Sequence, residues 1–264
     1  MMKSVLLLLI ITIFFLFINS VLSAQDSAPK TGVYLEEVFS YNGKTLNYRI
    51  LYPDGFDENK KYPLVLFLHG AGERGDNNQT QLVHGSKLWI ANSKKYPAIV
   101  IFPQCPKEDF WAKISRPGGK GSFKFSEAGP PTKALQSTIK LAETFLEKDF
   151  VDQDRFYVGG LSMGGMGTFE LAWRMSDKIA AAFPICGGGA SSNATVMKNI
   201  PFWIFHGVVD DVVPARYSMQ MLRAIQGADG KAKISLYPNV NHNSWDKAFA
   251  EPDLLPWVFS KKLK

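Results

Sequence analysis

Short continuous apolar runs alternate with helical patterns along most of this chain. Runs of this kind, rich in β-branched and aromatic residues, are typical of strands buried on both faces of a sheet. They lie at 63–68, 98–102, 156–160, 179–185 and 201–205, and a further strand-like run lies at 233–237. Helical patterns follow them at 80–93, 131–148, 166–175, 213–226 and, interrupted by Pro252 and Pro256, at 244–260. This alternation predicts a mostly parallel sheet with helices on both faces.

The first two strand-like runs, 34–39 and 45–52, are joined by a turn that contains Asn42-Gly43. Asn-Gly between such runs favours a tight hairpin, because both residues tolerate positive φ. We therefore expect an N-terminal antiparallel hairpin attached to the parallel sheet. The fold class predicted from the pattern alone is α/β.

The first 24 residues have the pattern of an export signal. Lys3 is followed by apolar sequence from 5 to 18 and then by small residues at 21–24. We predict a signal peptide over 1–24, a secreted or periplasmic protein, and one domain over 25–264, with no membrane attachment after cleavage. The apolar stretch is also long enough for an uncleaved anchor, so that alternative stays open.

Composition narrows the functional classes further. The formal net charge is +6, but the basic residues are scattered or gathered at the C-terminus rather than arranged in a stripe with aromatics. We therefore expect no nucleic-acid partner. Four histidines lie singly and two cysteines lie far apart, which is not the spacing of a zinc site. The sequence indicates no metal and no cofactor.

The segment Gly160-Leu161-Ser162-Met163-Gly164 matches the motif G-x-S-x-G. It lies between a buried strand and a helix, which is the context of a nucleophile elbow, a sharp turn that presents a reactive serine. The alternative is a glycine-rich turn whose serine only caps the following helix. The motif by itself leaves both interpretations open.

Other chemically useful residues follow the carboxyl ends of later strands, where open α/β sheets bind ligands. They appear in the order Ser162, then Asp210 or Asp211, then His242. A serine hydroxyl needs an imidazole to take its proton, and the imidazole needs a carboxylate to orient it. The developing oxyanion needs N–H donors, for which we select the backbone of Met163 and of Ala71, with Gly72 as the next choice.

The sequence resembles α/β-hydrolases of the esterase branch that includes polyhydroxybutyrate-depolymerase-like, feruloyl-esterase-like and dienelactone-hydrolase-like proteins. Five blocks carry the resemblance: LHGAGERGDN at 68–77, FPQCP at 102–106, GGLSMGG at 159–165, HGVVDDVVP at 206–214 and NHNSWD at 241–246. The resemblance implies the α/β-hydrolase fold, Asp210 as the acid and His242 as the base. Ser162 departs from dienelactone hydrolases, which use cysteine, and this disfavours a lactone substrate.

Several neighbouring residues have two interpretations. If Asp210 is the acid, Asp211 is expected to cap the helix near 213. We expect His69 and His206 to be packed histidines that hold loops. His84 is expected to have a structural role or to lie on the surface. Trp245 is expected to pack in the interior, and Asp246 to begin a helix. The charged loop Glu73-Arg74-Gly75-Asp76 is expected to be braced by a local ion pair rather than to contact substrate. Trp111 and the loops 104–130 and 187–199 are expected to wall the substrate pocket.

The strand order that the resemblance implies separates Cys105 from Cys186 by three inter-strand steps, or about 14 Å. A disulfide requires Cα atoms within about 7 Å, so we predict two free, buried thiols. The leading hypothesis is a secreted serine esterase acting through an acyl-enzyme on short acyl, acetyl or feruloyl esters, either small molecules or linked to polysaccharide. The alternatives are a peptidase of the prolyl-oligopeptidase type without its propeller, and a non-catalytic binding module.

Overall fold

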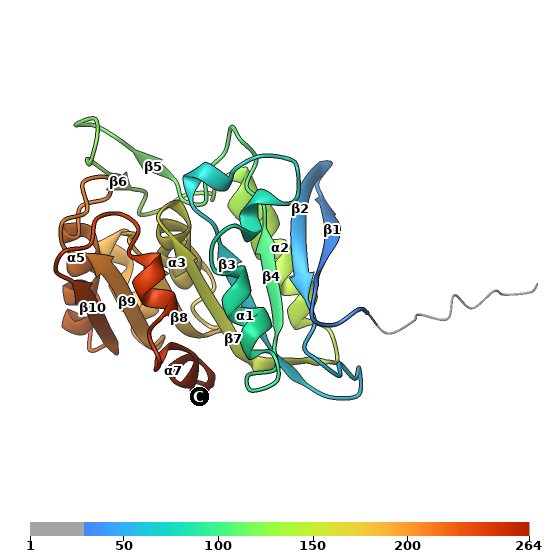
Figure 1. Ribbon diagram of the computed structural model, residues 1–264. Helices are drawn as coiled ribbons and strands as arrows, with labels where there is room; N and C mark the ends of the chain where they lie inside the picture. Colours follow the sequence, from blue (N-terminus) through green and yellow to red (C-terminus); the bar gives the residue numbers. More distant parts are fainter. Residues whose placement is uncertain (1–28, 264) are drawn as a thin grey trace, which may run out of the picture.

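An eight-stranded sheet runs through residues 29–263, which are the residues that the computed structural model describes (Figure 1). Its strand order is β1-β2-β4-β3-β7-β8-β9-β10. The strands are β1 (Tyr34–Tyr41), β2 (Lys44–Leu51), β3 (Tyr62–Leu68), β4 (Ile99–Pro103), β7 (Val151–Leu161), β8 (Ile179–Ile185), β9 (Phe202–Gly207) and β10 (Ala232–Tyr237). β2 pairs antiparallel with β1 and β4, and the other pairs are parallel.

The predicted hairpin is confirmed at the edge of this sheet. Tyr41 pairs with Lys44, and the two residues between them have the positive φ angles that the sequence requires, 49° at Asn42 and 69° at Gly43. The hairpin joins the sheet because β2 pairs with β4. The fold is therefore the expected α/β-hydrolase arrangement, with a mostly parallel sheet and an N-terminal antiparallel hairpin.

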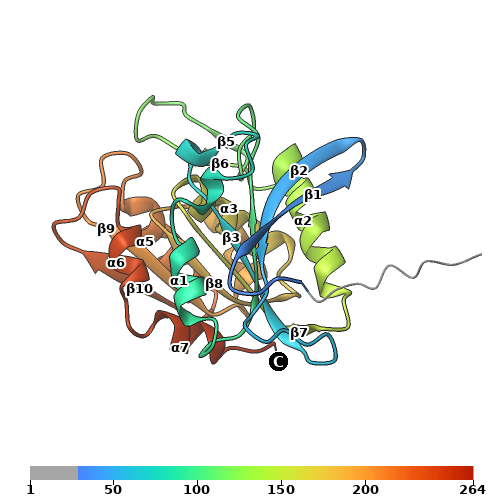
Figure 2. The same ribbon diagram turned by 45° about the vertical axis from the view of Figure 1, so that its right-hand side comes forward.

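Alternation along β3 divides the core into two layers, because successive side chains of a strand point to opposite faces. Leu64, Leu66 and Leu68 face one layer, and Val65 and Phe67 face the other. The first layer is covered by α2 (Lys133–Leu146), α3 (Met163–Arg174), α4 (Ala194–Met197) and α5 (Arg216–Gly227). The second is covered by α1 (Ser86–Asn92), α6 (Trp245–Phe249) and α7 (Leu254–Phe259), as Figures 1 and 2 show.

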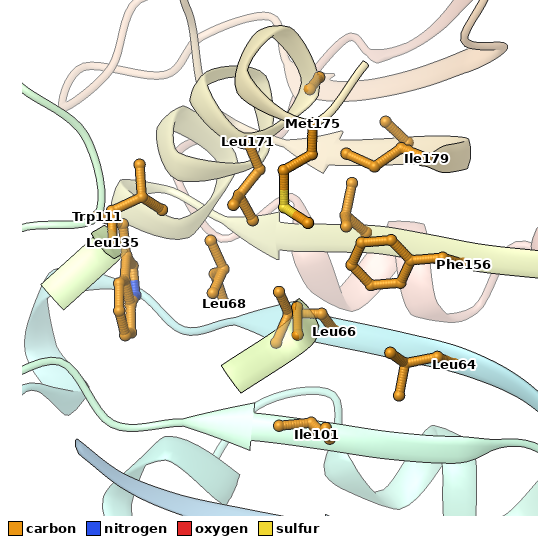
Figure 3. Close-up of a cluster of buried hydrophobic side chains, with 14 of the residues drawn as sticks. Leu64, Leu66, Leu68, Ile101, Trp111, Leu135, Phe156, Leu171, Met175 and Ile179 are labelled. Atoms are coloured by element: carbon orange, nitrogen blue, oxygen red, sulfur yellow. The ribbon is translucent and has the colours of Figure 1, made fainter. Parts of the chain in front are cut away.

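The first layer is shown close up in Figure 3. The leucines of β3 lie beside Phe156 of β7, Leu171 of α3 and Ile101 of β4, and all are essentially inaccessible to solvent. Each such side chain contributes about 1.5–3 kcal/mol when it is fully buried. This packing holds β3 and β7 side by side up to the pair Leu68 and Gly160, so the loops that follow the two strands begin next to each other.

The predicted helices differ from the structure at their ends. The helix expected at 80–93 is divided into η2 (Thr80–Leu82) and α1, because Gly85 between them has a φ of 82° that a helix cannot contain. The helix expected from 213 begins at Arg216. The C-terminal segment forms α6 and α7, and Pro256 lies in the first turn of α7, where its missing N–H is tolerated. The expected break at Pro256 was therefore wrong.

The first residues of α2 and β7 also differ from the sequence prediction, because of side-chain capping in α2 and strand pairing in β7. α2 begins after Thr132, whose Oγ1 accepts a hydrogen bond from the backbone N–H of Leu135. β7 begins at Val151, earlier than the apolar run, because it pairs there with Tyr62. The segment 104–130 contains a small ladder of β5 (Ile114–Ser115) and β6 (Lys124–Phe125).

Cys105 and Cys186 are both buried and free, as predicted. They follow β4 and β8, which β3 and β7 separate in the sheet. The predicted signal peptide lies outside the described residues. Within 29–263, no helix is both long enough and apolar enough to cross a membrane.

Candidate active site

Ser162 lies at the sharp turn between β7 and α3. Its φ of 54° and ψ of −115° are strained for a residue with a side chain, as expected for a nucleophile elbow. Gly160 and Gly164 make this turn feasible, since a Cβ atom on either would collide with the carbonyl oxygen of Leu68. The hydroxyl of Ser162 does not cap α3, so the alternative of a merely capping serine does not describe this turn.

Two hydrogen bonds connect Ser162, His242 and Asp210. The Oγ of Ser162 lies 2.8 Å from Nε2 of His242, and Nδ1 of His242 lies 2.8 Å from Oδ2 of Asp210. The residues come from the loops after β7, β10 and β9, which end at the same edge of the sheet. The structure therefore brings together the serine, histidine and acid that the sequence selected.

Asp210 and Asp211 are adjacent but have different surroundings. Asp210 is buried, and its Oδ1 accepts hydrogen bonds of 2.9 Å from the N–H groups of Val212 and Val213. Asp211 is exposed and pairs with Lys120 at 3.3 Å. The expected capping role of Asp211 was wrong, because Asp210 holds the following turn with one oxygen and His242 with the other.

The Asp210 carboxyl stays ionised because of its partners. Burial alone would raise its pKa, but hydrogen bonds from His206, His242 and the Val213 N–H outweigh burial and hold the pKa well below its usual range. An ionised carboxylate at Nδ1 fixes the imidazole tautomer whose Nε2 is free to accept a proton. The electrostatics therefore suit His242 to act as a base toward Ser162.

His206 and His69 are packed histidines, as expected. Nε2 of His206 lies 2.8 Å from the Val213 carbonyl and 3.2 Å from Oδ2 of Asp210, and its Nδ1 lies 2.7 Å from the hydroxyl of Ser218. His69 bonds only to backbone, and burial lowers its pKa to about 4. Each histidine supports a loop of the site without facing the cavity.

One group of metal-ligand types occurs among residues 29–263. Cys186, Asp210 and His242 have donor atoms within 4.8 Å of one another. Two of these atoms already bond to each other, and burial raises the pKa of the Cys186 thiol, so the thiolate that metals bind is disfavoured. The donors therefore fit a hydrogen-bonded triad better than a metal centre.

A cavity of about 260 Å³ opens beside Ser162. Ala71 and Met163, the residues selected as oxyanion donors, both line it. The remaining lining comes mainly from the turn 70–73 after β3, the loop 104–130 and the loops of Asp210 and His242. These residues are Gly70, Gly72, Glu73, His84, Phe110, Arg116, Phe123, Leu161, Met166, Val212, Val213, His242 and Trp245. The loop 187–199 does not line this cavity, contrary to expectation.

Trp111 is not a wall of this cavity, so that expectation was wrong. Its side chain is fully buried, its Nε1 donates to the His69 carbonyl at 3.1 Å, and it lies beside Leu135 in the core (Figure 3). Its neighbour Phe110 lines the cavity instead. Adjacent residues of an irregular loop point in opposite directions, and the loop has no periodicity from which the choice could be predicted.

Three residues assigned structural roles from the sequence also face the cavity. Arg74 donates to the carbonyls of Ala71 and Asp109 rather than pairing with Glu73, which lines the cavity with His84 and Trp245. Glu73, Arg74 and Asp76 form no ion pair with one another, so the expected local ion pair of the loop 73–76 was wrong. Asp246, in contrast, lies in the first turn of α6 as expected. Glu73 and Trp245 lie in the blocks at 68–77 and 241–246, whereas His84 lies outside all five blocks and had no sequence signal.

Comparison with known proteins identifies the family. The model of the phospholipase/carboxylesterase family matches residues 56–251. This chain belongs to that family. A solved thermostable esterase shares 32% identity and a TM-score of 0.78, over 87% of this chain and 63% of the other. The protein is therefore a carboxylesterase-like α/β-hydrolase.

Two curated relatives are longer than this chain. A bifunctional acetylxylan esterase/xylanase of Neocallimastix patriciarum is 28% identical over 151 residues, which are 57% of this chain and 20% of the relative. Poly(3-hydroxyalkanoate) depolymerase C of Paucimonas lemoignei is 28% identical over 202 residues, which are 75% of this chain and 43% of the relative. The chain thus spans less than half of the length of either relative.

Proposed function

We propose that this protein is an exported serine carboxylic-ester hydrolase that acts through an acyl-enzyme. Ser162 is the nucleophile, His242 the general base and acid, and Asp210 the group that orients His242. The observation that carries the proposal is the pair of 2.8 Å hydrogen bonds that link the three side chains. The export signal over 1–24 is the basis for a secreted or periplasmic location.

The reaction follows from the position of each proton. His242 Nε2 takes the hydroxyl proton of Ser162 while Oγ forms a bond to the ester carbonyl carbon. The N–H groups of Ala71 and Met163 donate to the resulting oxyanion. The bond to the alcohol oxygen then breaks, and His242 returns its proton to that oxygen. Water, deprotonated by His242, then attacks the carbonyl carbon of the acyl-enzyme. The bond to Oγ breaks, His242 returns the proton to Oγ, and the acid leaves a restored Ser162.

The substrate class follows from the family and the cavity. The relatives named above act, by their names, on acetylated xylan and on a polyester. A cavity of about 260 Å³ is slightly smaller than the roughly 300–1,000 Å³ of ligand sites, which favours a short acyl group. Acetyl, other short acyl and feruloyl esters are the substrates to test, as small molecules or on polysaccharide.

Replacement of the nucleophile tests the proposal. Ser162→Ala is expected to reduce kcat on 4-nitrophenyl acetate by about 10⁴-fold or more, because the acyl-enzyme cannot form. Hydrolysis is measured by release of nitrophenolate, and labelling by a fluorophosphonate probe reports the nucleophile. The wild-type protein, recovered outside the cytoplasm, is expected to begin after Ser23 or Ala24 by mass spectrometry. Undiminished hydrolysis by a folded Ser162→Ala protein would overturn the assignment.

A further inference from the structure

The carboxylate of Glu73 lines the catalytic cavity without a hydrogen-bond donor among the described residues. Its Oε2 is buried and unpartnered, and the side chain is 15% exposed. The basic side chain nearest to Oε1 is the imidazole of His84, with Nε2 at 3.8 Å, which is too far for a hydrogen bond. A buried carboxylate without a partner destabilises the folded protein, so it calls for a functional explanation.

Glu73 belongs to the turn that we assign to oxyanion binding. Glu73 is the last residue of η1 (Ala71–Glu73), and η1 begins directly after Gly70. A Cβ atom on Gly70 would lie 2.9 Å from Oε2 of Glu73, so the carboxylate lies against the backbone of this turn. Ser162 lines the same cavity. A group that binds Glu73 would therefore lie close to the reacting ester.

Aromatic rings connect Glu73 to the leaving-group side of the cavity. The His84 ring lies 5.1 Å from the ring of Trp245, and Trp245 lies edge-on to His242 at 5.5 Å. In the proposed mechanism His242 gives its proton to the departing alcohol. The wall formed by His84 and Trp245 thus extends from the position of the alcohol to the carboxylate of Glu73.

These features suit a ring that carries hydroxyl groups. An indole covers the apolar face of such a ring, and a carboxylate accepts strong hydrogen bonds from its hydroxyls. An ammonium group is less suitable, because Arg116 lines the same cavity and the His84 imidazole already faces Glu73. The cavity volume of about 260 Å³ fits a single ring rather than a longer oligomer.

We propose that Glu73, with His84 and Trp245, forms a subsite that binds the hydroxyl groups of a sugar-like alcohol in the ester substrate. This inference rests on the proposed esterase function and specifies its substrate class. Glu73 accepts a hydrogen bond from a hydroxyl of the alcohol ring while Ser162 attacks the carbonyl. The subsite therefore selects esters by the alcohol and not by the acyl group.

The test compares acetate esters of two six-membered-ring alcohols, one that carries hydroxyl groups and one that does not. Mono-O-acetyl methyl β-xyloside provides a hydroxylated ring, and cyclohexyl acetate provides a ring without hydroxyls. 4-Nitrophenyl acetate reports the triad. The variants are Glu73→Leu, which removes the acceptor, and Glu73→Gln, which keeps its shape. Glu127→Gln, at an exposed position outside the cavity lining, is the matched control for loss of one charge.

Glu73→Leu is expected to lower kcat/KM for the xyloside ester by about 10- to 100-fold, the range of one hydrogen bond to a charged group. Because Glu73 belongs to the turn assigned to oxyanion binding, a disturbance of that turn lowers kcat/KM for all three esters alike. The measured quantity is therefore the ratio of kcat/KM for the xyloside ester to that for cyclohexyl acetate, which is expected to fall by the same roughly 10- to 100-fold. Glu73→Gln is expected to lose less on the xyloside ester, because its amide oxygen still accepts. Glu127→Gln is expected to match wild type on all three esters.

The outcomes separate this inference from the proposed function. Equal losses on all three esters, or no loss on any, would refute the subsite while Ser162-dependent hydrolysis of 4-nitrophenyl acetate upheld the esterase. A selective loss on an alanyl ester, with the xyloside ester unaffected, would show that Glu73 binds an ammonium group and would overturn the inference. If Glu73→Leu does not fold, the ratio of the xyloside to the cyclohexyl ester in Glu73→Gln decides.

Discussion

The dipeptide His-Gly ends two buried strands of this protein, and the two copies support opposite halves of the site. His69-Gly70 follows β3 and begins the turn assigned to oxyanion binding. His206-Gly207 completes β9 and leads to the loop of Asp210. Both imidazoles are inaccessible to solvent. The same residues, in the same place at the end of a strand, therefore hold either a backbone turn or a carboxylate.

The difference lies in the atoms that face each ring. The N–H of Cys105 donates to Nε2 of His69 at 2.9 Å, and Nδ1 lies 2.6 Å from the Gly70 carbonyl, so a neutral ring satisfies both contacts. Nε2 of His206 faces two acceptors, the Val213 carbonyl and Asp210, and must therefore carry a proton. One histidine braces the backbone as a neutral ring, and the other donates to the acid.

The two ends of the site differ in the hydrogen-bond donors that surround their carboxylates. Asp210 is surrounded by donors from His206, His242 and two backbone N–H groups, which stabilise its negative charge. Glu73, at the β3 end, has no such donors among the described residues. The fully satisfied carboxylate suits a permanent role in orienting His242. The unsatisfied one suits a ligand that comes and goes.

The largest effect should come from the acid at the β9 end. Asp210→Asn is expected to lower kcat on 4-nitrophenyl acetate by about 10³- to 10⁴-fold, because the amide cannot hold His242 in the tautomer that accepts the Ser162 proton. Asp211→Asn, which removes an exposed partner of Lys120, is expected to stay within about twofold. Steady-state kinetics of both variants measure the contrast. Equal losses would show that the acid has been misassigned.

The second largest contrast is expected between the glycines of the two dipeptides, in the free energy of unfolding that each loses when it is replaced by alanine. A Cβ atom on Gly207 would collide with the carbonyl oxygens of Val240 and Asn241, backbone that leads to His242. A Cβ atom on Gly70 would lie 2.9 Å from the side-chain ends of Glu73 and Leu161, and the Cβ of Ser162 would be in ordinary contact at 3.7 Å. We expect Gly207→Ala to cost about 3 kcal/mol of unfolding free energy and Gly70→Ala about 1 kcal/mol. Denaturant unfolding monitored by tryptophan fluorescence measures both, and the reverse order would contradict the comparison.

The smallest effect concerns the protonation of His69. Its folded pKa of about 4 lies below the unfolded value of about 6.5, so the unfolded chain binds more protons between these values. The stability that the neutral ring contributes is therefore present above pH 6.5 and is lost as pH falls toward 4. We expect wild type to lose about 2 kcal/mol between pH 7 and pH 5 from this residue.

The matched variant for this pH dependence is His69→Gln, whose amide has no titration in the range. Its unfolding free energy is expected to be lower at pH 7 and flatter with pH than that of wild type. Denaturant unfolding at pH 5, 6 and 7 compares the two slopes. Parallel slopes in wild type and variant would exclude His69 as the source of the acid sensitivity.

Much of the fold was predictable because buried strands and turns have strong local signals. The apolar runs and the Asn42-Gly43 turn predicted the sheet and its hairpin, and both are confirmed. The boundaries were less predictable. The predicted 80–93 helix is divided at Gly85, and α7 includes Pro256. Both outcomes depend on tertiary contacts and on the exact residue at which a helix begins.

For the candidate catalytic residues, the sequence predicted the residue types, but it did not predict which loop side chains line the cavity beside them. Ser162, Asp210 and His242 each follow a strand that ends at the same edge, so their meeting follows from topology. Trp111 was assigned to the pocket and lies in the core. Glu73 was assigned to bracing a loop and His84 to a structural or surface role, and both face the cavity. Loop side chains have no periodicity, and their direction depends on the packing of the surrounding elements.

The amino-acid sequence by itself determined the fold class, the elbow at Ser162 and the order of the three catalytic candidates, because these depend on local patterns and on strand ends. Only the tertiary structure decided that Asp210 is both buried acid and turn cap, that His206 donates to it, and that Glu73 is left without a donor. Those properties arise from the few ångströms that separate residues far apart in the chain, and no local pattern encodes such distances.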